Sequence, residues 1–94
     1  MLAIVEVTTS NMPPEGDPLR EEHYAWCRRH TEAGNLVLAG HRTSDMGGVY
    51  LLQGKSLEEL RALSASDPYV VAGVARHHVT EYKARYGSAM KVLG

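Results

Sequence analysis

The 94-residue chain has a single cysteine, Cys27, and almost no excess of charge of either sign. One cysteine excludes a disulfide within the chain, and we take a reducing cytoplasm as the expected compartment. Ten basic and eleven acidic residues give a formal net charge of −1 and are interleaved along the sequence. This balance provides no general attraction for nucleic acids or anionic membranes, so we expect neither as a partner.

Long hydrophobic runs are also lacking. The N-terminal segment MLAIVEV lacks the basic residues of a signal peptide and is interrupted by Glu6. We therefore expect neither a signal peptide nor a membrane span. No internal repeat or low-complexity segment divides the chain. Its length is that of one domain, which we expect to span residues 1–94, with a core of about 1–82 and a C-terminal tail of 83–94.

Short apolar segments between turn-forming residues predict four strands. Their expected ranges are 2–7, 36–40, 49–53 and 74–82. The first three are apolar at both alternating positions, although an antiparallel sheet with one face in water should alternate between apolar and polar residues. Helices of the same chain can cover only one face. We therefore expect a second copy of the chain to cover the other face and form a homodimer.

Two helices are indicated by their capping residues. Asp17-Pro18 is typical of an N-cap followed by a first-turn proline, and it predicts a helix over 18–33. Ser56 begins a capping box, SLEE, at the start of the second helix, which Pro68 ends. The resulting order βαββαβ predicts an α+β, ferredoxin-like fold, with two helices on one face of a four-stranded antiparallel sheet.

Asp67 precedes a proline and lies among small and apolar residues, in the segment SASDPYVVAG. It either caps a single helical turn over 69–72 or is a carboxylate with a chemical role. His23 lies on the apolar stripe of the first helix with Leu19 and Cys27, so its imidazole needs a buried partner, a carboxylate or a backbone carbonyl.

Other clusters favour structural roles. His23 and Cys27 are one helical turn apart, a spacing that can activate a thiol, but a buried cysteine is more often a small hydrophobic residue. His77 and His78 on one strand point to opposite faces and cannot bind one metal together. No other cluster has metal-ligand spacing, and there is no glycine-rich phosphate loop or cofactor motif. We expect neither a metal nor an organic cofactor.

The segment LREEHYAWCRRHTEAGNLVLAG, followed a strand and a helix later by DPYVVAGV, resembles the YCII-related family of small dimeric α+β barrel proteins. The resemblance covers nearly the whole chain, from residue 1 to about 82. It implies a ferredoxin-like fold that dimerises through its sheets. It also implies an active site built on a His–Asp pair, which corresponds here to His23 and Asp67. With this pairing we expect Asp67 to do both jobs, with one oxygen capping the turn and the other accepting the N–H of His23.

The resemblance implies proton-transfer chemistry. His23 would act as general acid/base, Asp67 would orient and charge it, and Arg20 would hold an anionic group of a small organic substrate. Members of the family and its structural relatives are associated with lyase, isomerase and dehydrochlorinase reactions, so a cofactor-independent lyase or isomerase is implied. The alternative is a non-catalytic protein that binds a small ligand or serves as an assembly subunit.

Two further residues are candidates for substrate binding. Tyr69 is the aromatic residue of the Asp-Pro motif. His41 follows the glycine that ends the second strand, where the family usually has proline, and this departure is expected to change the pocket mouth. An exposed loop histidine is the alternative for His41.

The C-terminal tail combines three basic residues with Tyr82 and Tyr86. Such a mixture occurs in nucleic-acid-binding patches. The charge balance of the whole chain instead favours a subunit contact or a solvent-exposed end.

Overall fold

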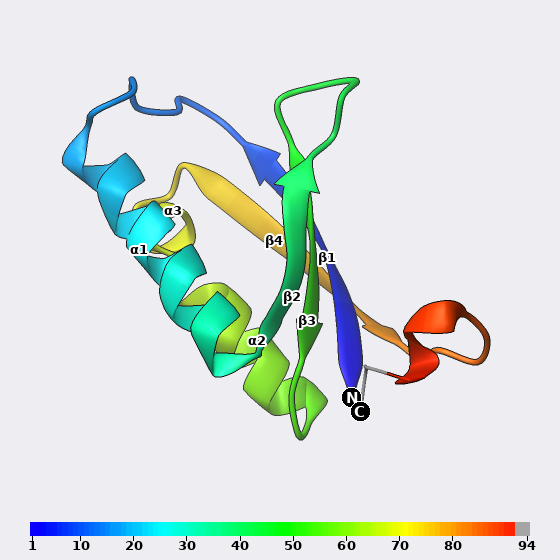
Figure 1. Ribbon diagram of the computed structural model, residues 1–94. Coiled ribbons are helices and arrows are strands. Elements are labelled where there is room, and N and C mark those ends of the chain that lie inside the picture. The colour runs from blue at the N-terminus through cyan, green and yellow to red at the C-terminus, as the bar shows by residue number, and fades with distance from the viewer. Residues whose placement is uncertain (92–94) are drawn as a thin grey trace.

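A computed structural model describes residues 1–91, which fold into one antiparallel sheet with helices along one of its faces (Figure 1). The sheet has four strands in the order β2-β3-β1-β4, and each neighbouring pair is antiparallel. The strands are β1 (Leu2–Thr9), β2 (Leu36–His41), β3 (Gly48–Gln53) and β4 (Ala75–Tyr82). The predicted ferredoxin-like α+β fold is confirmed.

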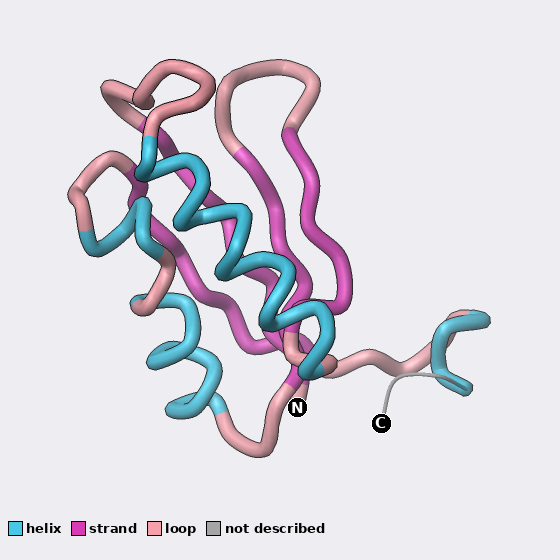
Figure 2. The backbone as a smooth tube through the Cα atoms, turned by 60° about the vertical axis from the view of Figure 1, so that its left-hand side comes forward, coloured by secondary structure: helices cyan, strands magenta, loops and turns pink. Residues whose placement is uncertain are grey.

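Three α-helices are present in the described residues, and they lie together on one side of the strands (Figure 2). They are α1 (Pro18–Ala33), α2 (Leu57–Ala65) and α3 (Pro68–Val71). The predicted tail, 83–94, contains a 3-10 helix over Ser88–Lys91 that projects away from the sheet (Figure 1), while residues 92–94 lie outside the described part. No helix of residues 1–91 is long and apolar enough to cross a membrane.

The helix ends follow from their capping residues. The side chain of Asp17 accepts a hydrogen bond from the amide of Leu19, and that of Ser56 accepts one from the amide of Glu59. The reciprocal bond of the expected capping box differs by one residue, because the Glu59 carboxylate accepts from the amide of Lys55. Such caps satisfy backbone donors that a helix leaves without partners.

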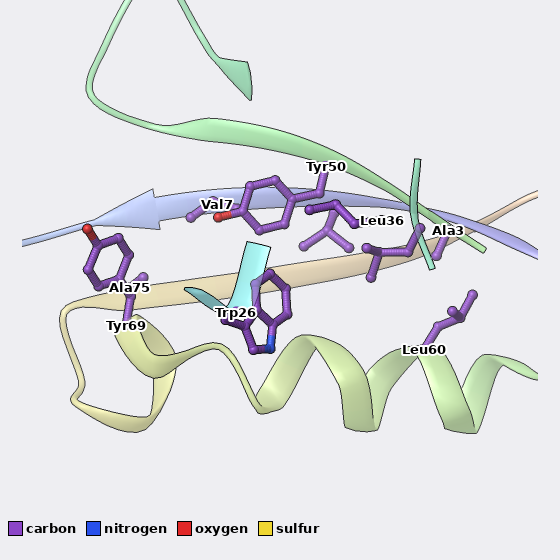
Figure 3. Close-up of a cluster of buried hydrophobic side chains, with 10 residues drawn as sticks. Ala3, Val7, Trp26, Leu36, Tyr50, Leu60, Tyr69 and Ala75 are labelled. Atoms are coloured by element: carbon purple, nitrogen blue, oxygen red, sulfur yellow. The ribbon is translucent and has the colours of Figure 1, made fainter. Parts of the chain in front are cut away.

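The core lies between the helices and the inner face of the sheet (Figure 3). Trp26 of α1 is 1% exposed, and its indole N–H donates to the hydroxyl of Ser66 at 2.9 Å. The other large core side chains come from β1, β2, β3, α2 and α3: Val5, Val7, Leu36, Tyr50, Leu52, Leu60 and Tyr69. This packing fixes α1 and α3 against the same end of the sheet.

Part of the outer face of the sheet, across β1, β2 and β3, is apolar as well. The sheet register aligns Leu38 of β2 with Leu51 of β3, and Leu51 with Ile4 of β1, so these three residues form a continuous row. Leu38 is 69% exposed, and Val49 beside the row is 38% exposed. Within residues 1–91 the helices cover only the opposite face (Figure 1). The alternation that a solvated antiparallel sheet should show is therefore missing on this face.

Candidate active site

The candidate site begins where α1 contacts α3. The Nδ1 atom of His23 lies 2.8 Å from Oδ1 of Asp67, and both side chains are buried. His23 occupies the inward side of α1, next to Trp26. Asp67 is the N-cap of α3, with extended backbone because Pro68 follows it. The structure thus brings together the two residues that the sequence singled out.

Asp67 both caps α3 and accepts from His23, as expected, but its two oxygens are used differently. Oδ1 accepts the amide of Tyr69 at 3.0 Å as well as the imidazole N–H of His23. The expected division, with one oxygen for each job, is wrong. The second oxygen, Oδ2, is 3.1 Å from Nε2 of His77 in β4. Because α3 lies beside β4, Oδ2 of Asp67 faces His77.

His77 is a residue that sequence reasoning did not connect with the site. Its side chain is 3% exposed, and its Nδ1 atom is 2.6 Å from the hydroxyl of Ser64 in α2. The signal in the sequence was its place in the strand, since it shares the inner face with Ala75 and Val79. His78 is exposed, in agreement with the prediction that the two histidines point to opposite faces.

The environment shifts the pKa of both members of the pair. Burial alone would lower the pKa of His23, but the hydrogen bond to Asp67 and the contact with Cys27 outweigh it and raise this pKa to about 9. Burial alone would raise the pKa of Asp67, but donors from His23, His77 and the Tyr69 amide hold it well below its usual range. At neutral pH the pair is therefore an imidazolium and a carboxylate.

A cavity of about 600 Å³ opens beside His23. Its walls come from one side of α1, the ends of β1, β2 and β3, and the start of α3. Arg20, His23, His41 and Tyr69 all line it. Asp67 does not line the cavity, because it is fully buried behind the imidazole. His23 is thus the member of the pair that a bound molecule can reach.

The three expected substrate-binding residues, Arg20, Tyr69 and His41, differ in the contacts that their side chains already make. Arg20 donates from Nε to the carbonyl of Pro13 at 2.6 Å and from Nη1 to the Tyr24 hydroxyl at 3.4 Å. The bond with Tyr24 raises the pKa of Arg20, so the guanidinium stays charged. The ring of Tyr69 stacks on His23 with centroids 4.0 Å apart. His41 is exposed and lies in the last position of β2, not in the loop that follows.

Cys27 is the closest group to the other ring nitrogen of His23. Its Sγ atom is 3.5 Å from Nε2, and both residues line the cavity. Because Nδ1 donates to Asp67, Nε2 is the ring nitrogen of His23 that this bond leaves free. Tyr50 also lines the cavity, and burial raises its pKa, which keeps the phenol neutral. Sequence reasoning did not place Tyr50 in the site.

The residues available to a metal ion do not converge. In residues 1–91, no group of three or more histidine, cysteine, aspartate or glutamate side chains has the arrangement of a metal site. His23, Asp67 and His77 are held in a line by hydrogen-bond and ion-pair distances instead of surrounding a common point. The arrangement is suited to moving and holding a proton.

Comparison with known proteins gives a family and a fold. The profile of the YCII-related domain matches residues 1–83. No curated protein matches the chain. Among solved structures, muconolactone isomerase is similar with a TM-score of 0.72 and 18% identity, over 94% of this chain and 93% of that one.

A second similar structure is 5-chloro-2-hydroxyhydroquinone dehydrochlorinase (TftG) from Burkholderia phenoliruptrix AC1100, in complex with 2,5-dihydroxybenzoquinone. The TM-score is 0.58 and the identity 20%, over 88% of this chain and 94% of that one. At this level of identity both structures establish the small α+β fold that they share with the chain.

Proposed function

The chain belongs to the YCII-related domain family, and from this membership we propose that it is a cofactor-independent enzyme using His23 as general acid/base. The observation that carries the proposal is the buried His23–Asp67 contact of 2.8 Å, which directs Nε2 of His23 into a cavity. We assign the reaction to the lyase or isomerase class. The two similar structures, named as an isomerase and a dehydrochlorinase, support this class as an analogy of fold.

Proton transfer begins from the charged pair. With a pKa of about 9, His23 is mostly protonated at neutral pH and holds a proton at Nε2. It can donate that proton to a developing enolate or phenolate, and the neutral imidazole can then take a proton from a neighbouring carbon or hydroxyl. Asp67 stays ionised throughout and keeps Nδ1–H in place, so that only Nε2 changes its protonation.

The cavity indicates a small substrate with an apolar body and an anionic group. Its size is within the range of small-molecule sites. The walls are mostly apolar or aromatic side chains, among them Val7, Met12 and Met46, and they suit a ring. Arg20 and the protonated His23 supply two positive charges to the lining. Of the two carboxylates that also line the cavity, Glu15 is 88% exposed at 3.7 Å from Arg20, and Asp45 is paired with Arg42. An anionic ring compound, such as a phenolic acid, satisfies both features.

We also propose that the chain is a homodimer whose two sheets pack through their outer faces. The row of Leu38, Leu51 and Ile4 is apolar, and in residues 1–91 no helix covers it. A second copy presents the same row and would bury both. The cavity opens on the helix-covered side of the sheet, so a sheet-to-sheet dimer leaves its entrance clear.

The experiment that tests the enzymatic role is a screen of small carboxylates, phenolic acids and lactones for turnover, followed by variants on any active compound. His23→Gln should reduce kcat by about 10²–10⁴-fold, the usual contribution of general acid/base catalysis. The matched control is His30→Gln, on the same helix and outside the lining of the cavity. Ligand binding without any turnover would support the alternative, a non-catalytic binding protein, and equal turnover in the two variants would exclude His23.

A further inference from the structure

Behind the proposed catalytic pair lies a second buried pair that the proton transfer does not use. The Oδ2 atom of Asp67 and the Nε2 atom of His77 are 3.1 Å apart, and neither has another partner among the described residues. The two atoms do not meet at the angle of an ordinary hydrogen bond. Their side chains are 0% and 3% exposed, so both are largely withdrawn from bulk water.

The carboxylate of Asp67 decides which nitrogen of His77 carries the proton, because a hydroxyl beside Nδ1 can either donate or accept. The hydroxyl of Ser64 is 2.6 Å from Nδ1 of His77, and Ser64 itself is 2% exposed. A hydroxyl can donate to Nδ1, which leaves Nε2 to carry the hydrogen and to point it at the carboxylate. The opposite tautomer would place a bare nitrogen lone pair against a buried, ionised oxygen. The Nε2–H tautomer is therefore the one that the surroundings favour.

We propose that His77 is a positioning residue of the site, which directs Nε2–H at Oδ2 of Asp67 across this 3.1 Å contact while the Ser64 hydroxyl pairs with Nδ1. The proposal rests on the proposed role of His23. Asp67 then has donors on both oxygens, with His23 and the Tyr69 amide on Oδ1 and His77 on Oδ2. The carboxylate cannot turn about its Cβ–Cγ bond without losing them, and its oxygen stays directed at Nδ1 of His23.

Few other ionisable groups face this arrangement. His77 is packed edge-to-face against the ring of Tyr50, with centroids 5.4 Å apart. Burial, and next the nearby carboxylate of Asp67, raise the pKa of Tyr50, so this phenol faces Asp67 as well. On its open side, a groove beside Ser64 and His77 is lined by Arg61 and His78. His23 faces Cys27 and the rings of Tyr24, Trp26 and Tyr69. Among the described residues, Asp67 is thus the one carboxylate in contact with both imidazoles.

His23 and His77 therefore have different roles. His23 lines the cavity and exchanges protons there, whereas His77 does not line it and acts only through the carboxylate. A change at His77 should therefore alter the ionisation of Asp67 without altering how a ligand fits. If turnover is found, His77→Phe should lower kcat and leave KM nearly unchanged.

The test measures ionisation directly and does not need a substrate. The 15N chemical shifts of the His77 ring in the unmodified protein should show the Nε2–H tautomer at neutral pH. In His77→Phe, which keeps a ring of similar size, the 13C titration of the Asp67 carboxyl should move upward by about one pH unit or more. His77→Gln offers an amide N–H in nearly the same place and should restore most of the shift.

The possible outcomes separate the claims. A Nδ1–H tautomer of His77 in the unmodified protein would overturn the proposal, even if the variants fail to fold. An unchanged Asp67 titration in a folded His77→Phe protein would also overturn it, because a residue that only fills space would leave that titration in place. The proposed enzymatic role fails separately, when His23→Gln leaves turnover intact whatever the result at His77.

Discussion

Both faces of the sheet carry apolar side chains, but only those of the inner face are buried by helices of the same chain. On the inner face, Val5 and Leu52 are fully buried, and the one polar strand side chain packed there, His77, lies against Asp67. On the outer face, Leu38 is 69% exposed and lies in a row with Leu51 and Ile4. The inner face is completed by the chain's own helices. For the outer face, we propose that a second copy of the chain covers it.

This difference shows where buried polarity is tolerated. Asp67 is fully buried on the helix side because each oxygen faces a donor, and an ionised group without such partners would be too costly there. The polar residues of the outer face, such as Glu6, His78 and Thr80, lie along β1 and β4 and are exposed. Function is therefore expected on the inner side and association on the outer side.

The largest expected effect breaks the inner face. Asp67→Ala leaves the N–H groups of His23, His77 and Tyr69 without an acceptor and should cost about 3–5 kcal/mol of folding free energy. Asp67→Asn, which keeps an oxygen for the cap, is the control and should cost clearly less. Urea unfolding at a fixed protein concentration measures both. Equal losses in the two variants would contradict this account of the carboxylate.

The next effect follows from the pKa of His23. Since folding raises this pKa from about 6.5 to about 9, the stabilisation is complete below about pH 6.5 and is lost as the pH rises through 9. Asp67, whose pKa is lowered, stabilises above about pH 4 and loses its contribution as the pH falls. The free energy of unfolding should therefore be highest between about pH 4 and about pH 6.5.

Between pH 6 and pH 9.5 the unmodified protein should lose up to about 3 kcal/mol. His23→Gln has no titrating group at this place and should show a flatter profile over the same range. Urea unfolding midpoints at several pH values check this. Parallel profiles of the two proteins would mean that His23 does not contribute its charge to stability.

A smaller effect tests the outer face. Leu38→Lys puts a charge into the proposed interface and should weaken dimerisation by about tenfold or more, roughly 1.4 kcal/mol. Ala33→Lys adds the same charge at the exposed end of α1 and should leave association unchanged. Sedimentation equilibrium gives both constants. A monomeric unmodified protein at micromolar concentration would exclude the dimer.

The smallest effect distinguishes two groups within the cavity. Cys27→Ser replaces the thiol near Nε2 of His23 with a hydroxyl. This variant should change kcat by no more than about threefold if His23 carries the proton transfer. Steady-state kinetics on any substrate found in the screen provide the measurement. Loss of turnover in this variant would instead make the thiol the reacting group, since the fold needs little from this half-buried side chain.

Much of the fold could be predicted because its signals are local. Asp17-Pro18 and Ser56 begin their helices where the structure has them, and the Asp67-Pro68 pair begins a separate short helix. The local pattern predicted only that a histidine on an apolar helix face requires a buried partner. The family resemblance identified that partner as Asp67, 44 residues away in the sequence.

The remainder of the site depends on distances that no local pattern contains. His77 looks like any alternating strand residue, and only the packing of β4 against α2 and α3 brings it to Ser64 and Asp67. The use of Oδ1 for two bonds was equally hidden, because the direction in which a carboxylate turns depends on all its donors. Tyr50 lines the cavity from a strand position that hydrophobic spacing assigns simply to the core.

The position of Trp26 has a practical consequence for spectroscopy. It is the only tryptophan of the chain, and its ring lies nearly parallel to that of His23, with centroids 6.1 Å apart. An imidazolium quenches indole emission more strongly than a neutral imidazole does. The intrinsic fluorescence should therefore brighten as His23 loses its proton near pH 9. The fluorescence of Trp26 should thus report the charge of His23 without any added label.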